Sequence, residues 1–91
     1  MDIEHNAAQR RFETVVDGVS SVLEYDLRDG VMTITHTGVP AEVGGRGIAG
    51  ALVTAAFETA RHEGWRVVPD CSYAAAWIQR HPAYADVLNR A

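Results

Sequence analysis

Hydrophobic and polar residues alternate over much of the first forty positions, and two Asp-Gly pairs interrupt the alternation, at Asp17-Gly18 and Asp29-Gly30. An Asp-Gly pair between segments rich in β-branched and aromatic residues is a strong signal for a two-residue hairpin turn. The pattern therefore predicts three antiparallel strands, at about residues 10–16, 19–28 and 31–37. The middle strand alternates most regularly, so one face of this sheet is expected to be buried and the other polar.

The second half of the chain changes to a helical period. Apolar residues recur every three or four positions from Ile48 to Ala60, and Gly64 is placed to end that helix. Residues 65–68 resemble a short buried strand, residues 71–79 a second helix, and the segment after Pro82 a last helical turn. The second helix is expected to pack inward through Ala75, Trp77 and Ile78. The order βββαβα predicts a single α+β domain over residues 1–91, with helices on one sheet.

Between the predicted third strand and the first helix lies a glycine-rich turn that contains one arginine. Gly44, Gly45 and Gly47 permit positive φ angles and close approach of the backbone to a ligand. The helix that follows contributes unpaired N–H groups and the positive end of its dipole, and Arg46 adds a positive charge at the rim. This combination suits a bound phosphate group.

The same loop also matches the dinucleotide-binding pattern Gly-x-Gly-x-x-Gly from Gly45 to Gly50, and Asp70 follows at about the spacing of a ribose-binding acid. That pattern requires a strand leading directly into its first glycine, whereas loop residues including Pro40 intervene here. The preceding strands form hairpins, and the chain has no room for a doubly wound sheet. A P-loop is excluded because Gly-Lys-Ser/Thr is absent.

Composition and charge narrow the choice of partners. Hydrophobic residues make up 47% of the chain and charged residues 22%, as in ordinary globular proteins. The net charge of −4, without a basic stripe, argues against nucleic acid. No apolar run predicts a membrane span and the acidic N-terminus is unlike a secretory signal, so we expect a cytoplasmic protein. Cys71 is the single cysteine, and no Cys/His spacing predicts a structural metal.

The glycine loop resembles the acetyl-coenzyme A loop of the Gcn5-related N-acetyltransferases, which has the pattern Gln/Arg-x-x-Gly-x-Gly/Ala. Residues 44–49 fit it at Gly47 and Ala49, and Val39-Pro40 resembles the Val-x-Pro that often precedes it. Gly44 departs from the pattern where the family has Gln or Arg, so one hydrogen-bonding side chain is missing. The resemblance extends to a small YjdJ-like subgroup and is carried by residues 11–13, Tyr25, residues 35–40 and 45–49, Pro69, and residues 71–73 and 80–84.

This resemblance implies a minimal acetyltransferase fold, without the N-terminal helix pair and the last strands of longer relatives. It implies acetyl-coenzyme A as cofactor and transfer of the acetyl group to an unidentified amine; a non-catalytic module that binds coenzyme A or acyl-coenzyme A is the alternative. The thioester carbonyl would meet a backbone N–H near residues 39–43. The residues expected to hold the cofactor are Val39, Pro40, Val43, Gly44, Gly45, Arg46, Gly47, Ile48 and Ala49.

Three side chains are candidates for catalysis. Cys71 lies near a helix start, where backbone N–H groups favour a thiolate, and the resemblance places it near the acyl end of the cofactor; it could equally be a small core residue. Tyr73 is the alternative acid that would protonate coenzyme A. His36 would share a strand face with Met32 and Ile34, either as a histidine at the edge of the core or as a general base beside Cys71.

Overall fold

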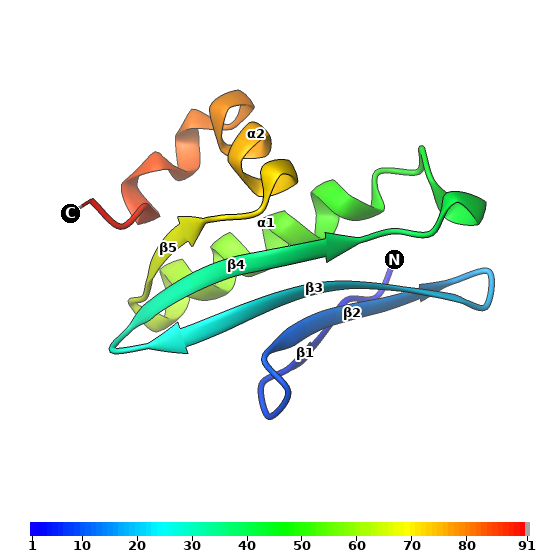
Figure 1. The fold of residues 1–91 in the computed structure, drawn as a ribbon, viewed down its shortest axis with the longest axis horizontal. Coiled ribbons are helices and arrows are strands. Elements are labelled where there is room, and N and C mark those ends of the chain that lie inside the picture. Colours follow the sequence, from blue (N-terminus) through cyan, green and yellow to red (C-terminus); the bar gives the residue numbers. More distant parts are fainter. Residues whose placement is uncertain (91) are drawn as a thin grey trace.

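The computed structural model describes residues 1–90. Its strands form one five-stranded sheet in the order β1-β2-β3-β4-β5, in which β4 and β5 are parallel and the other neighbours antiparallel. Figure 1 shows the consecutive antiparallel strands β1 to β4, the long helix α1 (Ile48–Glu63) along one face, and helix α2 (Ser72–Arg80) beyond β5. The strands are β1 (Glu4–Asn6), β2 (Arg11–Val16), β3 (Val19–Arg28), β4 (Val31–Gly38) and β5 (Arg66–Pro69). The α+β arrangement expected from the sequence is confirmed.

The two Asp-Gly pairs form the turns between β2 and β3 and between β3 and β4. Asp17 and Gly18 have φ angles of 51° and 75°, and Asp29 and Gly30 have the same values. Two consecutive positive φ angles match the twist of the flanking strands, which is why Asp-Gly specifies this turn so well. The three predicted strands are thereby confirmed to within one residue at each end.

Strand β1, which pairs with β2 at the edge of the sheet, is not predicted by the sequence pattern. His5 stacks on Phe12 with ring centroids 4.2 Å apart, and its Nε2 is hydrogen-bonded to the hydroxyl of Tyr25 at 2.6 Å. The buried Thr14 hydroxyl donates to the carbonyl of Asp2 at 2.7 Å. These contacts with residues of β2 and β3 hold a polar segment in place, and no local hydrophobic pattern indicates them.

Helix α1 (Ile48–Glu63) connects β4 to the parallel strand β5 and covers one face of the sheet. Its buried side chains, including Leu52, Val53 and Phe57, meet Leu23, Ile34 and other apolar residues that the strands direct toward it. Gly64 ends the helix at a φ of 78°, as predicted. Within the described residues, no helix is both long and apolar enough to cross a membrane.

Helix α2 (Ser72–Arg80) and the short 3-10 helix η2 (Pro82–Val87) pack beside α1. Trp77 contacts Phe57 of α1 at a centroid distance of 5.2 Å. The inward positions of α2 are Ala74, Trp77 and Ile78, so the expectation that Ala75 would be buried is wrong. The helix begins after Cys71 and its buried stripe follows the 74–77–78 spacing, which leaves Ala75 half-buried at its side.

We expect His5 to make the stability of the protein depend on pH. Burial lowers the pKa of His5 from its usual 6.5, against a smaller opposing effect of Glu63. His5 therefore binds a proton more readily in the unfolded chain than in the folded one. As a result, the free energy of unfolding falls as the pH drops below about 6.5. Chemical denaturation between pH 8 and 5 should show that the free energy of unfolding falls more steeply with decreasing pH in the parent than in His5→Gln. Equal slopes of unfolding free energy against pH would contradict the prediction.

Candidate functional site

The glycine loop after β4 presents its backbone rather than side chains. The 3-10 turn η1 (Ala41–Val43) is followed by Gly45 and Gly47, which have φ angles of 76° and 77°. A Cβ atom built on either glycine would meet nothing within 4 Å, so the space above them is open. Substituents at these two positions would fill that space, and the positive φ angles explain why glycine is placed there.

The start of α1 adds a set of N–H groups to this open space. The first backbone hydrogen bond of the helix runs from the N–H of Ala51 to the carbonyl of Gly47, at 3.0 Å. The N–H groups of Ile48, Ala49 and Gly50 therefore precede the hydrogen-bonded part of the helix. The cap residue Gly47 has no capping side chain, and the first turn contains no acidic residue. An anion placed here would meet backbone donors and the positive end of the helix dipole.

Beside the loop lies a hollow of about 280 Å³. Tyr73, on α2, closes one side: its hydroxyl oxygen would lie 3.4 Å from a Cβ atom on Gly50. The residues that line the hollow are Val39, Gly44, Gly45, Gly47, Ile48, Ala49, Gly50 and Tyr73. Gly50 was missed in the sequence analysis, although it is the last glycine of the Gly-x-Gly-x-x-Gly pattern.

Three residues expected to hold the cofactor do not line the hollow. Val43 is only 1% exposed and belongs to the hydrophobic core. Pro40 precedes the 3-10 turn as its cap residue. Arg46 forms an ion pair with Asp17 of the β2–β3 turn. The structure thus divides the predicted set into residues that face the hollow and residues that shape the loop around it.

Cys71 lies beside the middle of β4, at the point where β4 and β5 separate. The last paired residues are Ile34 and Pro69, and the N–H groups of Asp70 and Cys71 both donate to the carbonyl of Ile34, at 3.1 and 3.0 Å. Strand β4 continues to Gly38 beyond that point. Its edge is therefore not paired with β5 between residue 35 and the glycine loop.

The thiol of Cys71 has two polar neighbours. As the cap residue of α2, it accepts a hydrogen bond from the N–H of Ala74, with a distance of 3.3 Å between nitrogen and Sγ. The hydroxyl of Thr37, on β4, lies 3.5 Å from the same sulfur. The residue is half-buried. These contacts hold the sulfur at the point where β4 and β5 diverge, and Thr37 is a neighbour that the sequence analysis did not identify.

His36 is not beside Cys71. A β-bulge between β3 and β4 pairs Tyr25 with Ile34 but the preceding Glu24 with His36, so that Thr35 is the additional residue. One extra residue reverses the faces of the strand after it. Thr37 therefore points toward Cys71, whereas His36 is exposed on the opposite face with Glu24. The expectation that His36 shares a face with Met32 and Ile34 is wrong.

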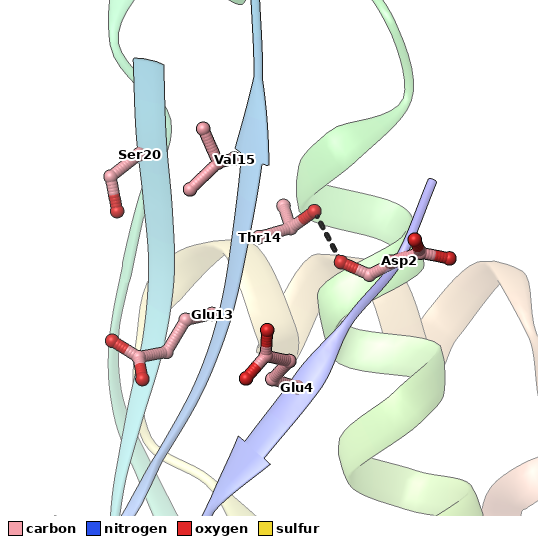
Figure 2. A pocket seen from close by; sticks show the side chains of 6 residues that line it. All are labelled: Asp2, Glu4, Glu13, Thr14, Val15 and Ser20. Atoms are coloured by element: carbon pink, nitrogen blue, oxygen red, sulfur yellow. Dashed lines mark hydrogen bonds between the residues drawn. The ribbon is translucent and has the colours of Figure 1, made fainter. Parts of the chain in front are cut away.

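A second hollow, of about 290 Å³, opens where β1 meets β2. Figure 2 shows three carboxylate side chains around it, from Asp2, Glu4 and Glu13. Glu4 and Glu13 are direct partners across the two strands. Three carboxylates would repel a phosphate-bearing ligand, because like charges at short range raise the free energy of binding. The described residues that line the hollow beside the glycine loop, in contrast, include no carboxylate.

Comparisons with known proteins identify the family. The sequence model of the GCN5-related N-acetyltransferase family matches residues 11–87. The structure is similar to the NMR solution structure of a GCN5-like protein from Staphylococcus aureus, with a TM-score of 0.77 and 27% sequence identity. That similarity covers 99% of this chain and 89% of the other. A family match over most of the chain, together with the same fold, shows that this protein belongs to the GCN5-related N-acetyltransferases.

Proposed function

We propose that this protein binds acetyl-coenzyme A and transfers the acetyl group to an amine. The observation that carries the proposal is the hollow beside the glycine loop, where open space above Gly45 and Gly47 adjoins the N–H groups at the start of α1. A diphosphate fits this site because its oxygens accept hydrogen bonds from such groups. Membership in the family supports acyl transfer as the type of reaction.

The remainder of the donor would follow the unpaired edge of β4 toward Cys71. Val39 lines the hollow, and Thr37 is the strand residue in contact with the thiol. An extended chain of amide groups can add hydrogen bonds to an open strand edge. This path would bring a thioester from the glycine loop to the place where β4 and β5 diverge, close to Cys71.

Two balanced routes for acetyl transfer use Cys71 at that position or Tyr73, whose hydroxyl lies in the neighbouring hollow beside Gly50. In the first, the sulfur of Cys71 attacks the acetyl carbonyl, and coenzyme A leaves as a thiolate and takes the thiol proton. An amine then attacks the acetyl group on Cys71, the C–S bond breaks, and the proton that the amine loses returns to the Cys71 thiolate as the amide forms. In the second, the amine attacks the donor directly and gives up its proton to solvent, while Cys71 or Tyr73 protonates the departing thiolate. Both routes need a neutral amine. His36 takes no part in either, since it lies on the other face of the sheet.

We expect coenzyme A to stabilise the fold and NAD to leave it unchanged. Both ligands contain a diphosphate, but only coenzyme A has a chain that could follow the open edge of β4. At a concentration of about 100 times Kd, a ligand adds about 2.7 kcal/mol to the free energy of unfolding, enough to raise the Tm of so small a domain by roughly 10 °C. A thermal scan in which NAD raises the Tm and coenzyme A does not would contradict the proposal.

A non-catalytic module that binds coenzyme A is the second candidate function. It is favoured by the loss of one hydrogen-bonding side chain at Gly44 and by the position of His36, which is exposed on the opposite face of β4 from the contact with Cys71. Such a module would show the same thermal shift but would not turn over. Hydrolysis or transfer measured with acetyl-coenzyme A and a panel of amines, alongside the Cys71 variants discussed below, separates the two functions.

A further inference from the structure

The glycine loop contains one positive side chain, and the structure shows it bound elsewhere. The guanidinium of Arg46 donates a hydrogen bond from Nη1 to Oδ2 of Asp17. Gly45 and Gly47, on either side of Arg46, line the hollow, whereas Arg46 does not. None of the described residues that line the hollow is basic. The ion pair thus directs the only cation of the loop toward the β2–β3 turn.

The position of Asp17 is fixed by the hairpin and not by the ion pair. Asp17 and Gly18 occupy the two central positions of the turn, with φ angles of 51° and 75°. The other Asp-Gly turn has identical angles at Asp29 and Gly30, although no ion pair between Asp29 and a described residue is present there. A stable hairpin therefore presents the Asp17 carboxylate to Arg46 whether or not a ligand is bound. Figure 1 shows this turn and the glycine loop at the same end of the sheet.

We propose that Asp17 competes with the diphosphate of the donor for Arg46, and so sets the affinity of the hollow. The inference rests on the proposed function, because it takes a diphosphate as the anion at the loop. A carboxylate and a diphosphate both accept hydrogen bonds from a guanidinium, and only one of them can hold the same N–H groups. Binding of the donor then exchanges one anionic partner of Arg46 for another, and the remaining carboxylate repels the phosphates.

The size of the effect follows from the exposure of the pair. The side chains of Arg46 and Asp17 are 46% and 68% exposed, so solvent screens their attraction. Exposed ion pairs contribute up to about 1 kcal/mol, which corresponds to about a fivefold change in an equilibrium constant. Release of Arg46 should therefore strengthen coenzyme A binding about two- to fivefold, and no more.

The test is a titration of the whole protein with coenzyme A, comparing the parent with Asp17→Asn. Asparagine is the residue best suited to this turn, so the hairpin is retained. The matched control is Asp29→Asn, which removes the same charge from the same type of turn. We expect Asp17→Asn to lower the Kd about two- to fivefold and Asp29→Asn to leave it nearly unchanged. In an Arg46→Gln background, Asp17→Asn should have no larger effect than Asp29→Asn.

Several results would overturn the inference. If the parent binds coenzyme A and Asp17→Asn binds it equally or more weakly, Asp17 does not compete, while the proposed function stands. An equal gain from Asp17→Asn and Asp29→Asn, or a gain that persists with Arg46→Gln, would assign the effect to net charge. If neither the parent nor Asp17→Asn binds coenzyme A, the proposed function fails and this inference fails with it.

Discussion

Replacement of Gly47 by valine is expected to abolish binding of coenzyme A while the protein still folds. Gly47 has a φ of 77°, and its missing Cβ leaves open space beside the N–H groups at the start of α1. A valine side chain would occupy the space through which phosphate oxygens reach those groups. We expect affinity to fall at least about 100-fold, which corresponds to about 2.7 kcal/mol. Isothermal titration calorimetry measures this directly.

The loss must be separated from backbone strain. Valine at a positive φ costs about 1–3 kcal/mol of stability, because its branched side chain is unsuited to the left-handed region. Gly64 provides a matched control, since it has a φ of 78°, open space around its absent Cβ, and a position at the far end of α1. Gly64→Val should lower the Tm by a similar amount and keep its affinity for coenzyme A. Unchanged affinity in folded Gly47→Val would place the phosphates elsewhere.

The parts of the fold that the sequence predicted are those specified by local chemistry. Each Asp-Gly turn needs two positive φ angles, and Gly64 ends a helix whose apolar stripe is visible over four turns. The glycine loop belongs to the same class, because its open backbone follows from the residues themselves. These features depend on neighbours close in sequence, so a periodic pattern and a few glycines are sufficient to locate them.

The errors arose where a contact between distant residues decided the outcome. A single bulged residue, Thr35, moved His36 to the exposed face and placed Thr37 beside Cys71, and no composition signal marks that residue. Strand β1 depends on the stacking of His5 on Phe12. The orientation of Arg46 depends on Asp17, 29 positions away. A prediction of site residues from one sequence therefore finds the loop more readily than the side chains that meet around it.

Substitution of Cys71 is expected to separate thiol chemistry from helix capping. The sulfur accepts a hydrogen bond from the N–H of Ala74, so Cys71→Ala removes both the thiol and the cap, at a cost of about 1 kcal/mol in stability. Serine is a preferred cap residue, and Cys71→Ser keeps an acceptor in nearly the same place without an easily formed thiolate. Both variants should bind coenzyme A as the parent does, because neither changes the glycine loop.

If Cys71 is the nucleophile, incubation of the parent with acetyl-coenzyme A should leave one acetyl group on it, detected by mass spectrometry at mildly acidic pH and removed by hydroxylamine. The chain contains no lysine, so acetylation of lysine side chains cannot mimic this adduct. Cys71→Ala and Cys71→Ser should both lose the adduct and most of the turnover, with Cys71→Ser retaining the stability of the parent. If the Cys71→Ser variant transfers acetyl groups to an amine at the parental rate, the sulfur serves only to cap α2. Tyr73 would then be the acid that protonates coenzyme A. In that case Tyr73→Phe should slow the release of coenzyme A by roughly 100-fold or more.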